Sequence, residues 1–169
     1  MIKIRCLNEK DPVYFAAEEC VQGWHSTPAK LEMRLQHERE GQCVSFVAEV
    51  DGAAAGYVFL YYQPHTGAFA NQGIPEIVDF AVLEKYRRQG VGSCLMDAAE
   101  KAAAETGNRV CLGVGLHAGY GSAQRMYVKR GYIPDGSGVW YQDRMCEPYS
   151  DCMNDDDLVL YMSKELKND

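Results

Sequence analysis

The sequence predicts a single α/β domain with a mixed sheet and helices on both of its faces. Strand-like runs come first as a hairpin, and later ones alternate with amphipathic helical runs. That order is typical of a sheet with helices packed on both sides. A chain of 169 residues is long enough for one domain with a full core and too short to suggest two. We therefore expect one domain over residues 1–169.

Hydrophobic periodicity and turn residues predict the individual elements. In chain order these are strand 2–5, helices 16–21 and 29–40, strands 43–50, 54–62 and 76–83, helix 91–106, strand 110–116, helix 122–130, and strands 139–142 and 158–163. Asp51-Gly52 supplies the positive φ angles of a tight hairpin turn between two strands. Residues 143–157 are expected to be irregular, either as a functional loop or as an ordinary solvated one.

The composition limits the classes of function. A net charge of −7 disfavours a nucleic-acid partner, because affinity for phosphates needs positive charge. The seven cysteines include no Cys-x-x-Cys pair, so we expect reduced thiols and no metal site. No apolar run approaches the roughly 20 residues of a membrane span, and the first residues lack the apolar centre of a signal peptide. We expect no membrane partner and a cytoplasmic protein.

The most informative run is a glycine turn between a predicted strand and a predicted helix, Arg87-Arg88-Gln89-Gly90-Val91-Gly92-Ser93. A helix start leaves N–H groups without partners and carries partial positive charge, so it can hold a phosphate if the backbone comes close. Gly90 and Gly92 permit that approach, and the two arginines add charge for a pyrophosphate. The run fits neither the three-glycine dinucleotide fingerprint nor a nucleotide-triphosphate loop. A simple turn with solvated arginines is the alternative.

Three ordered blocks resemble the GNAT acetyltransferase superfamily. Its signature of Arg or Gln, two residues, Gly, one residue, and Gly or Ala is similar to the glycine turn. The strand end Phe80-Ala81-Val82 and the later run Tyr127-Val128-Lys129-Arg130-Gly131-Tyr132 resemble the blocks before and after that signature. The resemblance covers about 74–132. Tyr120 departs from it, because the family often has Asn there.

The resemblance implies a fold and a reaction. The fold is a mostly antiparallel sheet of about seven strands, with a parallel, splayed strand pair at the coenzyme site. The reaction passes an acetyl group from acetyl-CoA, a co-substrate, directly to a primary amine in a ternary complex. A backbone N–H of Phe80, Ala81 or Val82 would stabilise the oxyanion, and the glycine turn from Arg87 to Ser93 would bind the coenzyme. Tyr127 would protonate the departing thiolate, although a packing role is the alternative.

Glu76 is the leading candidate for the general base that takes the proton of the amine. Residues 76–82 resemble the strand of the histone-acetylating branch, whose catalytic Glu stands at the corresponding place. Asp79 lies on the opposite face by strand alternation. His117, just after a predicted strand, is a lesser candidate.

The expected acceptor is an amine of a small molecule or a peptide, and the sequence does not choose between them. We hypothesise that the acidic stretch 143–157, with Trp140, Tyr141 and Tyr149 near it, helps to form its pocket, because carboxylates attract an ammonium group. A homodimer is left open. Two rival functions are a coenzyme-A-binding regulatory module without catalysis and a protein-protein adaptor that uses the acidic stretch. The adaptor predicts no affinity for coenzyme A.

Overall fold

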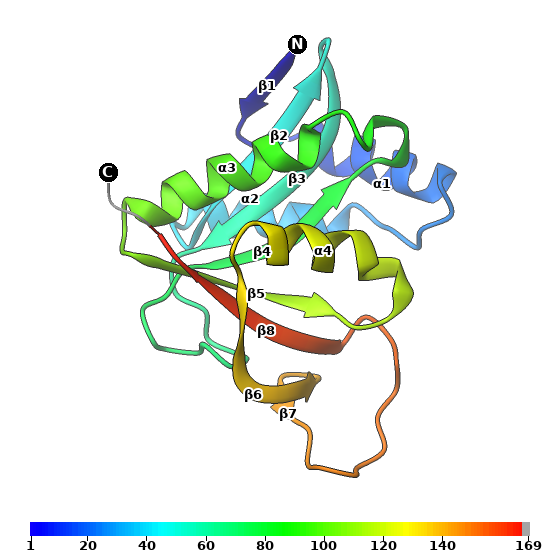
Figure 1. Cartoon of the computed structure of the whole chain (residues 1–169). Helices are drawn as coiled ribbons and strands as arrows, with labels where there is room; N and C mark the ends of the chain where they lie inside the picture. The colour runs from blue at the N-terminus through cyan, green and yellow to red at the C-terminus, as the bar shows by residue number, and fades with distance from the viewer. Residues whose placement is uncertain (167–169) are drawn as a thin grey trace. The chain divides into compact units, whose positions relative to one another are not determined.

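The computed structural model describes residues 1–166 (Figure 1). The strands are β1 (Ile2–Arg5), β2 (Cys43–Val50), β3 (Ala53–Tyr61), β4 (Glu76–Val82), β5 (Arg109–Gly115), β6 (Ile133–Tyr141), β7 (Arg144–Met145) and β8 (Leu158–Glu165). The α-helices are α1 (Asp11–Val21), α2 (Ala29–Arg39), α3 (Val91–Ala104) and α4 (Gly121–Lys129). Two short 3-10 helices are η1 (Glu84–Tyr86) and η2 (Ala118–Tyr120).

The strand pairing confirms the predicted fold class. Strands β4 and β5 pair in parallel, whereas β1–β2, β2–β3, β5–β8, β6–β8 and β6–β7 are antiparallel. The hydrogen-bonded order is β1-β2-β3-β4-β5-β8-β6-β7, so the described residues form eight strands rather than about seven. Every predicted helix and strand is present. Most ends are shifted by a few residues, but α1 begins at Asp11 rather than at 16, and β6 also begins earlier than expected.

Two expectations in the C-terminal part were wrong. The stretch 143–157 was expected to be irregular, but Arg144–Met145 forms β7, which pairs with β6. Strand β6 itself begins at Ile133 rather than at 139. Pro134, Gly136 and Gly138 interrupt its pattern, since proline and glycine normally weaken a strand. The register of β6 shifts over that same stretch, where it pairs with β8.

The chain divides into two compact units. Unit 1 contains residues 1–61 and 78–102, and unit 2 contains residues 62–77 and those from 103 onward. Strand β4 and helix α3 each run from one unit into the other. The single domain expected over 1–169 stays a prediction, and its last three residues lie outside the described part.

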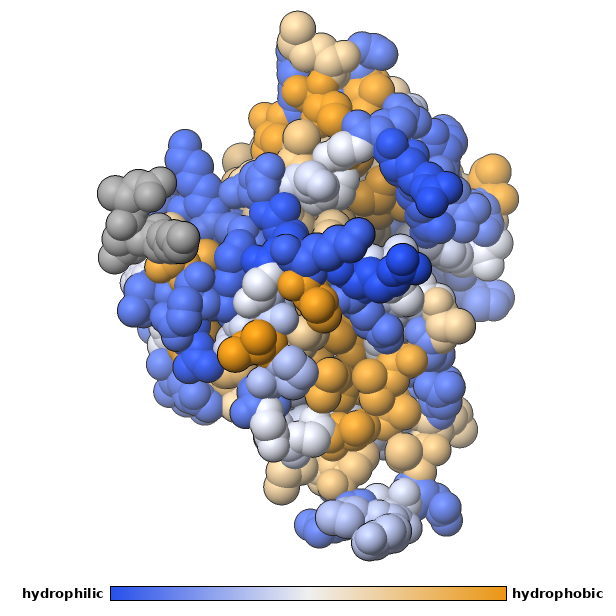
Figure 2. Space-filling view, viewed as in Figure 1, coloured by the Kyte–Doolittle hydropathy of each residue, from blue (hydrophilic) through white to orange (hydrophobic). Residues whose placement is uncertain are grey.

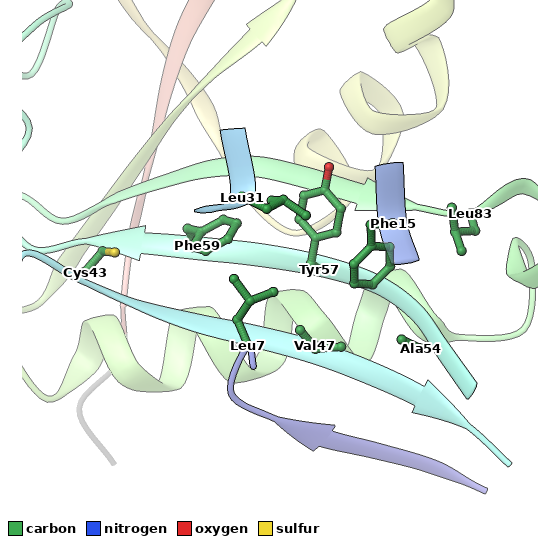
Figure 3. Packing of buried hydrophobic residues seen from close by; sticks show 9 residues of the cluster. All are labelled: Leu7, Phe15, Leu31, Cys43, Val47, Ala54, Tyr57, Phe59 and Leu83. Atoms are coloured by element: carbon green, nitrogen blue, oxygen red, sulfur yellow. The ribbon is translucent and has the colours of Figure 1, made fainter. Parts of the chain in front are cut away.

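Unit 1 has helices on both faces of its strands. Phe15 of α1 and Leu31 of α2 pack with Tyr57 of β3 in a buried cluster (Figure 3). The rings of Phe15 and Tyr57 meet edge to face with centroids 4.8 Å apart. Gly56 faces the other way because side chains alternate along a strand, and a Cβ added there would lie 3.2 Å from Leu95 of α3. Helices α1 and α2 therefore cover one face, and α3 covers the other.

The turn between β2 and β3 confirms the predicted hairpin. Asp51 and Gly52 have φ angles of 50° and 87°. Positive φ at both central residues matches the right-handed twist of the paired strands. The register of β2 against β3 follows from this tight turn.

Unit 2 has its own hydrophobic cluster around β5 and β8. Phe69, Cys111 and Tyr161 form it, and the ring of Trp140 packs edge to face on Tyr161 with centroids 5.5 Å apart. Figure 2 shows hydrophobic and hydrophilic residues side by side on one face of the molecule. Within residues 1–166, none of the helices is both long and apolar enough to cross a membrane.

Candidate active site

The predicted glycine turn leads from η1 into α3 in unit 1. Residues 87–90 are exposed, and Gly90 has a φ of +87°. Glycine adopts this left-handed conformation readily, whereas a residue with a Cβ is strained there. The N–H of Cys94 donates to the Gly90 carbonyl at 3.0 Å, which closes the first turn of α3. The N–H groups of 91–93 belong to the first turn of a helix and so have no intrahelical acceptor.

The two arginines of the turn differ in their surroundings. Arg87 Nη1 lies 3.2 Å from Glu84 Oε1, and its guanidinium lies 5.6 Å from the ring centroid of Trp24. The Glu84 carboxylate therefore partly matches the Arg87 charge, although exposed ion pairs contribute little. Arg88 is exposed and has a φ of +62°. Gln89 Nε2 donates to the Lys85 carbonyl at 2.9 Å and ties the turn back to η1.

Strand β4 is kinked at Asp79, which has a φ of +51°. We call this residue and its two peptide bonds the β4 kink. The parallel pairing of β4 with β5 is formed by Glu76 with Cys111 and Ile77 with Leu112, just before the kink. Irregularities of this kind often lie next to active sites, because they redirect backbone and side chains. Phe80, Ala81 and Val82 follow the kink directly.

The Asp79 carboxylate, the alternative to Glu76 at the sequence level, is held in an ion pair. Arg34 Nε of α2 donates to Asp79 Oδ2 at 2.7 Å. Burial opposes the charge of Arg34, but the charge of Asp79 and the hydrogen bond to it outweigh burial and raise the pKa of Arg34. The positive φ of Asp79 also breaks the regular alternation on which its expected orientation depended.

Gly56 of β3 was not singled out from the sequence. A Cβ added to it would lie 2.5 Å from the Ala81 carbonyl oxygen and 3.1 Å from Val82 Cα. The backbone of β4 therefore approaches β3 too closely for any side chain at this position. A lone glycine within a strand is the sequence signal for such a close approach.

Tyr127 of α4 is a buried residue of unit 2. The residue is 5% exposed, and its ring centroid lies 5.8 Å from that of Tyr132. Burial, with a smaller effect of Tyr120, raises the pKa of Tyr127. The hydroxyl therefore stays protonated at neutral pH, as a proton donor requires.

Glu76 also belongs to unit 2, at the start of β4. It is half-buried, and the N–H of its β5 partner Cys111 donates to the Pro75 carbonyl at 2.9 Å. Burial raises the pKa of Cys111 and of Tyr161, and the negative charge of Glu76 adds to both shifts. The carboxylate thus acts on the same side chains that form the hydrophobic cluster of unit 2.

A hydrogen-bond network joins the end of β5 to the acidic stretch. Asp156 Oδ1 lies 2.9 Å from His117 Nε2 and 2.8 Å from the Tyr120 hydroxyl. His117 Nδ1 accepts from the Gly119 N–H at 3.0 Å, so both ring nitrogens are engaged. The Tyr120 ring lies where a Cβ on Gly115 would be. Tyr120, which stands where the family often has Asn, is therefore part of this hydrogen-bond network.

Some carboxylates of the acidic stretch accept hydrogen bonds from nearby groups of the protein. Besides Asp156, Asp155 accepts from the Tyr141 hydroxyl at 3.2 Å and from the Asp157 N–H at 3.0 Å. A pocket of about 460 Å³ in unit 2 is lined instead by Tyr141, Arg144, Glu147 and Asp151, among others. In the part of the chain described here, no cluster of three or more His, Cys, Asp or Glu could hold a metal ion.

Comparison with known proteins shows which class of protein this chain resembles. The chain is 32% identical over 105 residues to an N-alpha-acetyltransferase of Sulfurisphaera tokodaii, a match covering 58% of this chain and 61% of that protein. Ard1 from Thermoplasma volcanium superposes with a TM-score of 0.67 and 25% identity, over 99% of both chains. The ribosomal-protein-S18-alanine N-acetyltransferase of Escherichia coli has the same fold, with a TM-score of 0.69 and 14% identity over 100% of this chain and 96% of that one.

The family follows from a match that spans most of the chain. Residues 10–132 match the model of the acetyltransferase (GNAT) family. The chain therefore belongs to this family of acetyltransferases.

Proposed function

We propose that this enzyme transfers an acetyl group from acetyl-CoA to a primary amine by direct attack in a ternary complex. The observation that carries the proposal is the glycine turn of 87–93, which is exposed over 87–90 and opens α3 after the kinked strand β4 and the short helix η1. All of the expected coenzyme-binding residues belong to unit 1.

The glycine turn fits a pyrophosphate. Its backbone N–H groups point along the start of a helix of 14 residues, where the partial positive charge favours an anion. The left-handed Gly90 presents no Cβ to such a group, and only Ile2 Cδ1, at 3.8 Å, lies near the place a Cβ would take. In this proposal Arg88 adds a solvent-facing charge, and Arg87 adds less because Glu84 partly matches it.

Residues 80–82 are proposed to stabilise the oxyanion with a backbone N–H. The support is their position directly after the β4 kink, where parallel pairing with β5 has ended. A donor that is already oriented stabilises developing charge without reorganisation, and removal of one such donor typically lowers kcat by about 10²–10³-fold.

Tyr127 is proposed as the donor to the departing thiolate, and Glu76 as the base that takes the proton of the amine. The raised pKa of Tyr127 keeps its proton in place and makes it a weak acid. Its role is therefore a strong hydrogen bond to the sulfur, with proton transfer as the thiolate develops. Glu76 is a half-buried carboxylate at the start of β4, in the strand that leads to the proposed oxyanion donors.

The acceptor we propose is the α-amine of a peptide. The named activities of the relatives support this choice, since one is an N-alpha-acetyltransferase and another acetylates an alanine of a ribosomal protein. The pocket of unit 2 has the charges to receive a peptide end, because Glu147 and Asp151 attract an ammonium group and Arg144 attracts a carboxylate.

A panel of acceptors tests the proposal. The full chain is given acetyl-CoA with a short peptide bearing a free α-amine, the same peptide with a blocked α-amine and one lysine, or a small diamine. We expect the highest kcat/KM for the free α-amine. Equal or faster acetylation of the lysine or the diamine would reject the peptide terminus as acceptor. Thermal stabilisation by acetyl-CoA without transfer to any amine would indicate a coenzyme-binding module instead.

A further inference from the structure

An ion pair in unit 1 joins helix α2 to the β4 kink. Arg34 Nε and Asp79 Oδ2 are 2.7 Å apart, although the residues are 45 positions apart in the sequence. The two side chains are only 20% and 22% exposed. Solvent therefore screens this pair less than it screens an exposed pair. The ion pair therefore links α2 to β4 in a defined geometry.

The guanidinium of Arg34 is itself held in place. Its Nη1 donates to the Tyr61 hydroxyl at 2.7 Å, and that hydroxyl lies 2.6 Å from His37 Nδ1. The guanidinium carbon also lies 5.0 Å from the centroid of the Tyr61 ring. Arg34 thus reaches the Asp79 carboxylate from a fixed position between α2 and β3.

The kink needs such a hold. The left-handed conformation costs an L-residue about 1–2 kcal/mol, and aspartate tolerates it better than most. A return of Asp79 to extended φ would rotate the peptide plane that leads into it and change the path of the chain into Phe80. The following N–H groups would then point in new directions. Strained residues of this kind persist where their surroundings over-determine them.

We infer that Arg34 is a positioning residue for acetyl transfer: through Asp79 it holds the β4 kink and so aims the backbone N–H groups of Phe80–Val82. This inference rests on the proposed function. Arg34 acts on the reaction only through the shape of β4. Its loss should therefore affect the transition state more than the binding of either substrate.

The test compares Arg34→Gln with Arg39→Gln. Both arginines lie on α2 and form ion pairs, but Arg39 pairs at 2.8 Å with exposed Glu9, which precedes α1 and is not part of β4. We expect Arg34→Gln to lower kcat by about tenfold to a hundredfold, with each KM changed less than threefold. Arg39→Gln should leave kcat unchanged. An equal loss in both variants, or a loss confined to KM, would overturn the positioning role.

A second readout does not depend on activity. The backbone amide resonances of Phe80, Ala81 and Val82 should move in Arg34→Gln and stay in place in Arg39→Gln. Unmoved resonances in folded Arg34→Gln would overturn the inference. If the parent acetylates no amine, the proposed function fails, while these resonances still decide whether Arg34 shapes β4.

Asp79→Gly covers the case in which Arg34→Gln does not fold. Glycine adopts a φ of about +51° without strain and has no carboxylate for Arg34 to hold. In that background, adding Arg34→Gln should change kcat by less than about twofold, because the coupling has been removed. A further loss of tenfold or more would show that Arg34 acts by another route, against the inference.

Discussion

The Ala81 carbonyl oxygen lies against Gly56 so closely that a Cβ added to Gly56 would be 2.5 Å from it. Gly56 on β3 permits this approach because it has no side chain, and Ala81 is one of the proposed oxyanion donors. The neighbouring Val82 Cα would be 3.1 Å from the same Cβ. Backbone atoms cannot yield as the end of a flexible side chain can, so β4 itself must shift.

Gly56→Ala is therefore expected to lower both stability and turnover. Overpacking of this kind costs about 1–3 kcal/mol, and the displaced β4 should lower kcat by at least about tenfold. Gly107→Ala is the control, since a Cβ there meets nothing within 4 Å. Melting temperature and kcat are measured for both variants. If Gly56→Ala has the melting temperature and the kcat of the parent, β4 does not depend on this contact.

Gly90→Asp should abolish acetyl-CoA binding while the chain still folds. The side chain would bring strain and negative charge to the proposed pyrophosphate site. Gly92→Asp should act similarly through its charge. Gly52→Asp is the matched control, because Gly52 has the same φ of +87° in the β2–β3 hairpin. Calorimetric titration with acetyl-CoA measures the binding. If folded Gly90→Asp binds acetyl-CoA with the affinity of the parent, the turn is not part of the coenzyme site.

The sequence predicted most of the architecture because its signals are local. The Asp51-Gly52 turn and the apolar face of α3, with Val91, Leu95 and Ala99 buried, need no distant partner to be recognised. Strand β6 was predicted too short, since its one proline and two glycines contradict local strand propensity while pairing with β8 overrides it.

The arrangement around β4 could be predicted only in part. The glycine turn has a local pattern, so its place at the start of α3 was expected. The contact of Arg34 with Asp79 and that of Gly56 with Ala81 join distant parts of the sequence. The hydrogen bonds of His117 and Tyr120 to Asp156 are likewise non-local, and they show why an acidic run need not be available to a substrate.

Tyr127→Phe separates packing from catalysis, because it removes one oxygen and keeps the buried ring. We expect a single-turnover rate at least about tenfold lower, with acetyl-CoA affinity and melting temperature little changed. Tyr132→Phe, which alters the neighbouring buried tyrosine, should keep the parent rate. Single-turnover measurement prevents slow product release from hiding the effect. Equal rates for Tyr127→Phe and the parent would make Tyr127 a packing residue.

Asp156→Asn should reduce stability in a pH-dependent way. Hydrogen bonds from His117 and then Tyr120 lower the pKa of Asp156 in the folded chain. Its ionised form therefore stabilises the fold above the ordinary aspartate pKa of about 3.9, and this contribution disappears as pH falls through the lowered value. The difference in melting temperature between parent and variant should be small, largest at neutral pH and absent in strong acid. A difference that grows on acidification would contradict the network.

We propose that this chain moves an acetyl group from acetyl-CoA to an amine, with the coenzyme held at the glycine turn. The most direct test incubates the full chain with acetyl-CoA labelled with carbon-13 at the carbonyl and a peptide bearing a free α-amine, followed by mass spectrometry of the peptide. We predict labelled peptide with the parent at a rate that saturates in both substrates, and none above background with Gly90→Asp. Peptide that stays unlabelled would contradict this proposal, provided that acetyl-CoA is present at a concentration that gives the parent its full thermal stabilisation. Labelling of the peptide by Gly90→Asp at the parent rate would contradict it as well.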